Sequence, residues 1–186
     1  MLIKKSDMPN LSKLTPKVVP CFIAGCLAGR DYNKDNIGKK VLPILARLID
    51  KAIDEYNYAK KFVEAEEAEN KMPHETIKER NQGQFLYTCP IINHLENCIT
   101  TLARIYKVKA TYFGHTKKQD LLNMRNSIEH IDDRIRDTIE ESPVLNISED
   151  SLIIEIAAKD NGKIQIKTSS IAEEIINLYH EIKKLL

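Results

Sequence analysis

A helix expected over residues 117–141 carries the side chains whose types and spacing are best suited to chemistry. At about 100° per residue, its apolar side chains share one sector and most of its polar ones lie opposite. Asn126 and His130 belong to the polar side and, being four residues apart, are neighbours on the helix surface. Arg125 lies on the flank between the two sides. An imidazole transfers protons near neutral pH, and a guanidinium binds oxyanions. The apolar sector consists of Leu121, Met124, Ile128, Ile131, Ile135 and Ile139.

Two plainer readings of these side chains stay open. His130 points about 160° away from the apolar sector, which argues against a histidine of the core. A solvent-exposed helix face, however, explains the polar side chains on composition alone. Arg125 and Glu129 are four residues apart, so they can form a surface ion pair worth only about 0.2–0.5 kcal/mol. Asp133, three residues beyond His130, can hold the imidazole.

The segment Arg125-Asn126-Ser127-Ile128-Glu129-His130 resembles the R-x4–6-H signature of the HEPN superfamily of RNA-cleaving helical bundles. The residue after the arginine is typically polar in that family, and here it is Asn126. The resemblance covers about residues 38–186, because the motif lies in a long amphipathic helix that one more helix follows. One position departs from some toxin members, which carry a modifiable tyrosine two residues after the histidine. Asp132 stands there in this chain.

The resemblance implies a metal-independent endoribonuclease that needs no cofactor. RNA supplies the nucleophile, its own 2′-hydroxyl. His130 would take that proton or protonate the leaving 5′-oxygen. Arg125 would bind the phosphate and its developing charge, and Asn126 would orient the phosphate or the imidazole. The expected products are a 2′,3′-cyclic phosphate and a 5′-hydroxyl, with a role in defence, stress or toxin–antitoxin biology.

The spacing of the motif also predicts a homodimer. Arg125 and His130 are about 7.5 Å apart along the helix and about 140° apart around it, so one helix does not readily direct both at one phosphate. HEPN proteins typically pair two motif helices across a two-fold axis. The expected partners are a second copy, an RNA substrate, and an antitoxin or regulatory protein.

The local charge gives little support for RNA binding. Residues 117–142 hold five basic and seven acidic side chains. Lys117 and Lys118 are the candidates for binding the substrate, with Lys107 and Lys109 as alternatives nearby. A solvated helix end explains these lysines equally well.

Periodicity predicts a mainly α fold, an antiparallel helical bundle with a β-hairpin before the C-terminal helix. Residues 1–37 form an irregular segment with at most one short helix, near 21–28, and residues 38–186 form a single domain. Long helices are expected over 38–70, 84–107 and 117–141, with a short helix over 75–81. The hairpin covers about 151–168, because Asn161-Gly162 separates two β-rich runs. Ser169-Ser170 would cap the last helix.

Composition excludes several classes of protein. Lys and Arg total 28 against 27 for Asp and Glu, so the chain does not wrap nucleic acid by bulk charge. The longest apolar run, residues 18–28, is too short to span a bilayer, and it lies too far into the chain for an ordinary signal peptide. No cysteine forms a C-x-x-C pair, so no metal site is expected. The four cysteines, at positions 21, 26, 89 and 98, are expected to be reduced and mostly buried in a cytoplasmic protein.

The sequence therefore leaves three functions to compare. The first is an endoribonuclease of HEPN type, which the intact Arg125, Asn126 and His130 favour. The second is a non-catalytic, HEPN-like dimeric binding or scaffold protein. The third is an unrelated helical bundle in which the motif occurs by chance.

Overall fold

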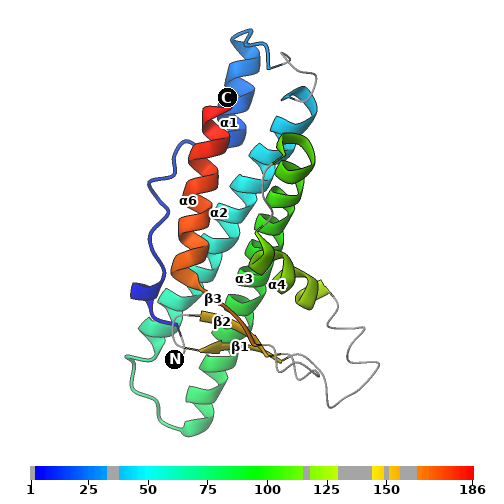
Figure 1. Ribbon diagram of the computed structural model, residues 1–186. Helices are drawn as coiled ribbons and strands as arrows, with labels where there is room; N and C mark the ends of the chain where they lie inside the picture. The colour runs from blue at the N-terminus through cyan, green and yellow to red at the C-terminus, as the bar shows by residue number, and fades with distance from the viewer. Residues whose placement is uncertain (1–2, 33–37, 115–117, 130–143, 149–150, 156–162) are drawn as a thin grey trace.

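The computed structural model describes residues 3–32, 38–114, 118–129, 144–148, 151–155 and 163–186. Two long helices, α2 (Gly38–Glu69) and α3 (Ile77–Phe113), lie side by side in opposite directions (Figure 1). The chain is mainly helical, as the periodicity predicts. The other helical elements are the 3-10 helix η1 (Lys5–Asp7), α1 (Val18–Leu27), α4 (Gln119–Glu129) and α6 (Thr168–Lys184). The strands are β1 (Val144–Ser148), β2 (Ser151–Glu155) and β3 (Lys163–Lys167).

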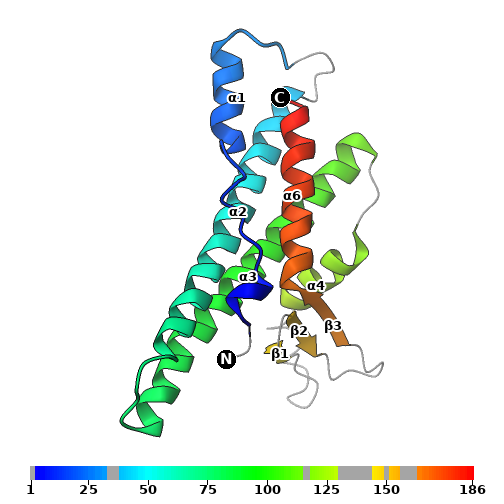
Figure 2. The same ribbon diagram turned by 90° about the vertical axis from the view of Figure 1, so that its left-hand side faces the viewer.

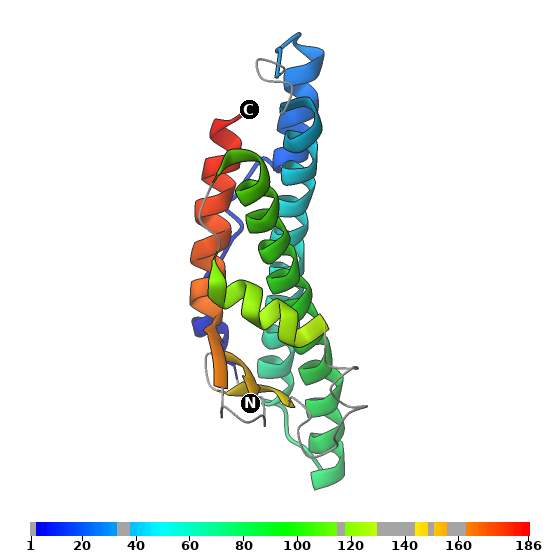
Figure 3. The ribbon, with the colours of Figure 1, turned by 45° about the vertical axis from the view of Figure 1, so that its right-hand side comes forward.

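Helix α2 follows its apolar period closely. Side chains three and four residues apart face the core from Val41 to Val63, and Tyr56 in the middle is fully buried. Helices α1, α3 and α6 all pack against α2, and α4 packs against α3. Figure 3 shows α4 crossing α3 obliquely. The core is therefore built around α2.

Helix α3 corrects the expectation of two separate helices over 75–81 and 84–107. It runs unbroken through Pro90 to Phe113. Thr76 and Glu79 form a capping box: the Glu79 amide donates to Thr76 Oγ1 at 3.1 Å, and the Thr76 amide donates to Glu79 Oε2 at 2.9 Å. Burial of Ile91 and the apolar residues after it offsets the hydrogen bond that Pro90 cannot make. Gly114 ends the helix in the left-handed region, at φ +67°.

The segment before α2 belongs to the same core. Its apolar side chains Ile3, Met8, Leu11 and Leu14 are buried among those of the bundle. The Lys60 ammonium donates to the Met8 carbonyl at 2.8 Å, and the Tyr179 hydroxyl donates to the Pro16 carbonyl at 2.9 Å. Figure 2 shows this segment running along α2 and α6.

A buried carboxylate joins α1 to α2. Asp50, on α2, accepts the Val18 amide at Oδ1 (2.8 Å) and the Val19 amide at Oδ2 (2.9 Å). These are two of the amides that the first turn of α1 leaves without helical partners, and a negative charge at this end also complements the helix dipole. Lys17 forms an ion pair with Asp54, one turn further along α2. The short helix expected near 21–28 is α1, and it begins earlier than expected, at Val18.

The glutamates near the end of α2 contact the N-terminal segment. Lys5 forms an ion pair with Glu64 at 3.1 Å, and its amide donates to Glu67 Oε1 at 2.6 Å. Glu66 is only 5% exposed, and burial raises the pKa of its carboxyl group. The N-terminal segment covers these glutamates, a contact between distant parts of the chain that composition does not reveal.

The expected hairpin is confirmed, and it has a third strand. Strand β2 pairs antiparallel with β3, and β1 pairs antiparallel with β2. The Asn161-Gly162 turn lies outside the described residues. Helix α6 begins at Thr168, directly after β3, so Ser169 and Ser170 are in its first turn and do not cap it. The apolar side of α6 is buried, whereas Leu185, directly after the helix, is 44% exposed.

The cysteines are less buried than expected. Cys98 is buried, Cys21 is half-buried, and Cys26 and Cys89 are exposed. All four are free thiols. Burial raises the pKa of the Cys98 thiol, so that thiol is the least reactive of the four. No helix among the described residues is long and apolar enough to cross a membrane.

We expect Asp50→Ala to lower the free energy of unfolding by about 1–2 kcal/mol, the cost of losing a helix N-cap. Asp50→Asn keeps one acceptor oxygen and should cost less. Urea unfolding followed by circular dichroism measures both variants. An unchanged free energy of unfolding in Asp50→Ala would show that the two amide bonds of Asp50 do not stabilise α1.

We expect Glu66→Gln to gain stability over the wild type as pH rises. Burial raises the pKa of Glu66, so the folded protein binds this proton more tightly than the unfolded chain, and the associated stability is lost as pH rises through the folded-state pKa. Glutamine stays neutral throughout. Urea unfolding at about pH 4 and about pH 7 measures the difference, with the exposed Glu173→Gln as the matched control. A constant difference between Glu66→Gln and wild type would contradict the prediction.

Candidate functional site

Helix α4 positions two of the three motif residues. Leu121 and Met124 are buried and Ile128 is half-buried against the core, which fixes how the helix is turned. Asn126 is consequently exposed, and Arg125 is half-buried on the flank. The wheel analysis is thus confirmed for the described part of the helix. His130 and the residues after it up to Pro143 lie outside the described residues, as does Lys117.

The outward face of α4 is polar along its described length. Gln119, Asn123 and Asn126 are exposed, and the Gln119 amide donates to Asn123 Oδ1 at 2.7 Å. A row of amides with no carboxylate among them can donate to and accept from a ligand at the same time. This face suits recognition of phosphates or nucleobases, and it suits contact with a second copy equally well.

The lysines near α4 are engaged in ion pairs across elements. Lys118 Nζ lies 3.0 Å from Glu174 Oε2 on α6. Lys109 is buried, and its ammonium lies 2.5 Å from Glu181 Oε2, also on α6. Lys109 therefore does not face a substrate, which corrects that alternative, whereas Lys107 is exposed. The charge of Lys118 is offset by Glu174 in the free protein.

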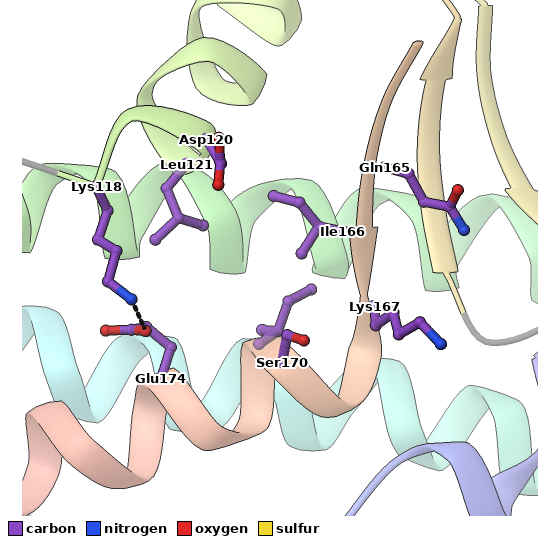
Figure 4. Close-up of a pocket in the computed structure, with 9 residues that line it drawn as sticks. Lys118, Asp120, Leu121, Gln165, Ile166, Lys167, Ser170 and Glu174 are labelled. Carbon is purple, nitrogen blue, oxygen red and sulfur yellow. Dashed lines mark hydrogen bonds and ion pairs between the residues drawn. The ribbon is translucent and has the colours of Figure 1, made fainter.

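A groove of about 240 Å³ lies between the start of α4, strand β3 and the start of α6. Its floor is apolar, formed by Leu121, Ile166 and Ile171. The polar and charged residues that border it are Lys118, Asp120, Gln165, Lys167, Ser170 and Glu174. Figure 4 shows that the side chains of Gln165 and Lys167 point to the other side of β3, away from this floor. We call this feature the α4–α6 groove.

Carboxylates outnumber cations at the α4–α6 groove. Lys118, Asp120 and Glu174 are the charged lining residues other than Lys167, whose side chain points to the other side of β3. Burial, together with the nearby carboxylate of Glu181, raises the pKa of Glu174. The groove consequently offers hydrogen-bonding groups beside an apolar floor.

The sequence analysis finds Lys118 and misses the rest of this groove. Gln165, Lys167, Ser170 and Glu174 come from a strand and a helix that begin more than 30 residues after the end of α4 in the chain. One sequence signal could have found part of the groove. At residues 163–184 a strand with alternating apolar and polar residues is followed directly by an amphipathic helix, so their side chains lie close together. Nothing in that pattern says that α4 lies opposite.

A second cluster of titratable side chains joins α2 to α3. His94 Nδ1 lies 2.7 Å from Glu55 Oε2, and the imidazole stacks against the rings of Tyr58 and Phe62 with centroids 5.3 and 5.6 Å away. The partner of His94 is thus Glu55 of the other helix and not its sequence neighbour Glu96. These interactions hold α2 and α3 together, so the cluster is explained by the packing of the two helices.

The described residues contain no group of three or more His, Cys, Asp or Glu side chains that could hold a metal ion. Compared with protein-family models, with curated proteins and with solved structures, the chain has no significant match.

Proposed function

We propose that the protein is a metal-independent endoribonuclease of HEPN type, which cleaves RNA by attack of a 2′-hydroxyl on the adjacent phosphate. The observation that carries the proposal is the placement of Arg125 and Asn126 on α4. This helix is held by Leu121 and Met124 in the core, and it presents Asn126 outward. A mainly helical bundle, in which α6 follows the motif helix, is the context that the family resemblance requires.

Each motif residue has its own role in the proposed reaction. Arg125 donates hydrogen bonds to the non-bridging oxygens of the scissile phosphate, where negative charge develops as the 2′-oxygen attacks. His130 takes the 2′-hydroxyl proton or protonates the departing 5′-oxygen. Asn126, one helical turn before His130, orients the phosphate or the imidazole. The 2′-oxygen–phosphorus bond forms as the phosphorus–5′-oxygen bond breaks, which leaves a 2′,3′-cyclic phosphate and a 5′-hydroxyl.

The proposal includes a homodimer in which two motif helices line one cleft. The exposure of Asn126 and of the amides beside it leaves this face of α4 accessible to a second copy. Such a cleft directs the arginine of one protomer and the histidine of its partner at one phosphate. An antitoxin or regulatory protein would then act by covering the cleft.

A second candidate function has its own support. Lys118 is paired with Glu174 and Lys109 is buried, so two of the cations expected to attract RNA are already engaged. This favours a non-catalytic, dimeric binding or scaffold protein with the same fold.

The main experiment measures RNA cleavage in EDTA by the wild type and three variants. We expect Arg125→Ala and His130→Ala to lose about 100-fold or more of the cleavage rate, and Asn126→Ala to lose less. A terminal 2′,3′-cyclic phosphate identifies the chemistry.

Two matched controls test whether these losses are specific. Arg104→Ala removes an exposed arginine from α3, and His180→Ala removes an exposed histidine from α6. Both should cleave as the wild type does. Undiminished cleavage by Arg125→Ala and His130→Ala would reject the assignment of the site. A folded wild-type dimer that leaves varied RNAs intact would favour the scaffold protein.

Sedimentation tests the dimer. We expect twice the chain mass of 21.3 kDa at tens of micromolar. Asn126→Arg would place like charges across the two-fold axis and should shift the protein towards monomer, whereas Asn177→Arg on the exposed side of α6 should not. A monomeric wild type would argue against a shared cleft.

A further inference from the structure

We propose that the end of the molecule formed by α1 and the last turn of α6 binds the surface of a membrane rich in anionic lipids. This inference goes beyond the proposed function and does not depend on it. Three observations carry it: an exposed apolar face on α1, the projection of α1 beyond the bundle, and cations beside that face.

The apolar face belongs to a helix without charged side chains. Residues 18–29 contain none. Val18 and Gly25 turn towards the bundle and are buried. The opposite side of α1 is exposed, and we call it the α1 outer face. Its members follow the helical spacing of three and four residues: Pro20, Ile23, Ala24 and Leu27. Apolar side chains gathered on an exposed face mark a surface that binds a membrane or a protein.

The α1 outer face lies at one end of the molecule. Figures 1 and 2 show the end of α1 projecting beyond the start of α2 and the end of α6. Leu27 ends the helix, and at 85% it has the most exposed of the large apolar side chains in the described part of the chain. A projecting apolar end can enter the flat surface of a membrane, whereas a partner protein would need a matching hollow.

Cations lie directly beside the α1 outer face. A cavity of about 420 Å³ separates α1 from the end of α6, and Arg30 and Lys183 line it together with Ala24 of the outer face. Arg30 Nη1 donates to the Leu186 carbonyl at 2.7 Å, and Lys183 Nζ donates to the Tyr179 hydroxyl at 3.0 Å. A guanidinium has five N–H groups and an ammonium has three, so both cations keep donors for a lipid phosphate.

The charge of this end fits an anionic surface. Residues 18–32, 38–47 and 180–186, which form it, hold six basic and two acidic side chains. One of the two acidic residues, Glu181, is already paired with the buried Lys109. Clustered lysines and arginines are attracted to anionic headgroups, whereas lysine is depleted in protein–protein interfaces. The cluster therefore favours a membrane over a protein partner.

The first experiment measures binding of the full chain to vesicles by co-sedimentation. The vesicles consist of phosphatidylcholine alone, or of phosphatidylcholine and phosphatidylserine in equal parts. We expect the wild type to pellet with the anionic vesicles only, and to be released by added salt, which screens the attraction. Leu27→Asp should lower its partition coefficient at least about tenfold, because a leucine is no longer buried and a repelled charge is added. The double variant Lys183→Gln, Lys184→Gln should lower it about tenfold.

Each variant has a matched control at the start of α3, which lies at the opposite end of the bundle (Figure 1). Ile77 is 80% exposed, so Ile77→Asp makes the same kind of change outside the α1 outer face. The double variant Lys78→Gln, Arg80→Gln also removes two cations. Both controls should bind as the wild type does. Circular dichroism checks that every variant is folded.

The second experiment detects insertion directly. The chain has no tryptophan, so Leu27→Trp places a single fluorophore on the α1 outer face. We expect its emission to shift to shorter wavelength on anionic vesicles and to be quenched by brominated acyl chains, because the indole leaves water for the headgroup–acyl boundary. Ile77→Trp should show neither change.

Four results would overturn the proposal: no binding to anionic vesicles, equal binding to both kinds of vesicle, wild-type binding by Leu27→Asp, and an unquenched Leu27→Trp. Sedimentation without vesicles tests the other possible occupant of this face. A wild-type dimer that Leu27→Asp dissociates, combined with no vesicle binding, would assign the α1 outer face to a second copy and not to a membrane.

Discussion

The burial of one side of α2 is the constraint on which the rest of the structure depends. Helices α1, α3 and α6 and the 3-10 helix η1 all pack against it. The fully buried Tyr56 lies midway along this side. Helix α4 packs mainly on α3 and is anchored by its own buried Leu121 and Met124, so the orientation of Arg125 and Asn126 depends on that packing. The site is thus two packing steps away from the centre of the core.

Periodicity was sufficient to predict the elements that have one continuous apolar side. Helix α2, the β2–β3 hairpin and the buried side of α6 are all present near their expected bounds. It was insufficient where two local signals compete. Pro90 suggested a break in α3, but the capping box at Thr76 and the burial after Pro90 hold a single helix. Strand β1 is short and was not expected. It is a strand because it pairs with β2, and its own sequence pattern does not indicate that pairing.

The sequence predicted the parts of the site whose residues lie close together in the chain. Arg125 and Asn126 share one helix with the apolar residues that orient it, so a wheel placed them correctly. The α4–α6 groove was not predictable, because it needs Leu121 to meet Ile166 and Ile171 from a distant part of the chain. Ion pairs show the same limit. Sequence identified Lys118 and Lys109 as cations, but only the fold shows that Glu174 and Glu181 neutralise them.

The junction between β3 and α6 has a mechanical consequence. Lys167 ends the strand and Thr168 begins the helix, so two walls of the α4–α6 groove form one continuous piece without a hinge. The buried Thr168 hydroxyl donates to the Asp7 carbonyl at 2.8 Å, which ties this corner to the N-terminal segment. Any change in the width of the groove must therefore come from α4. The same helix carries Arg125, so opening or closing the groove would also move the arginine.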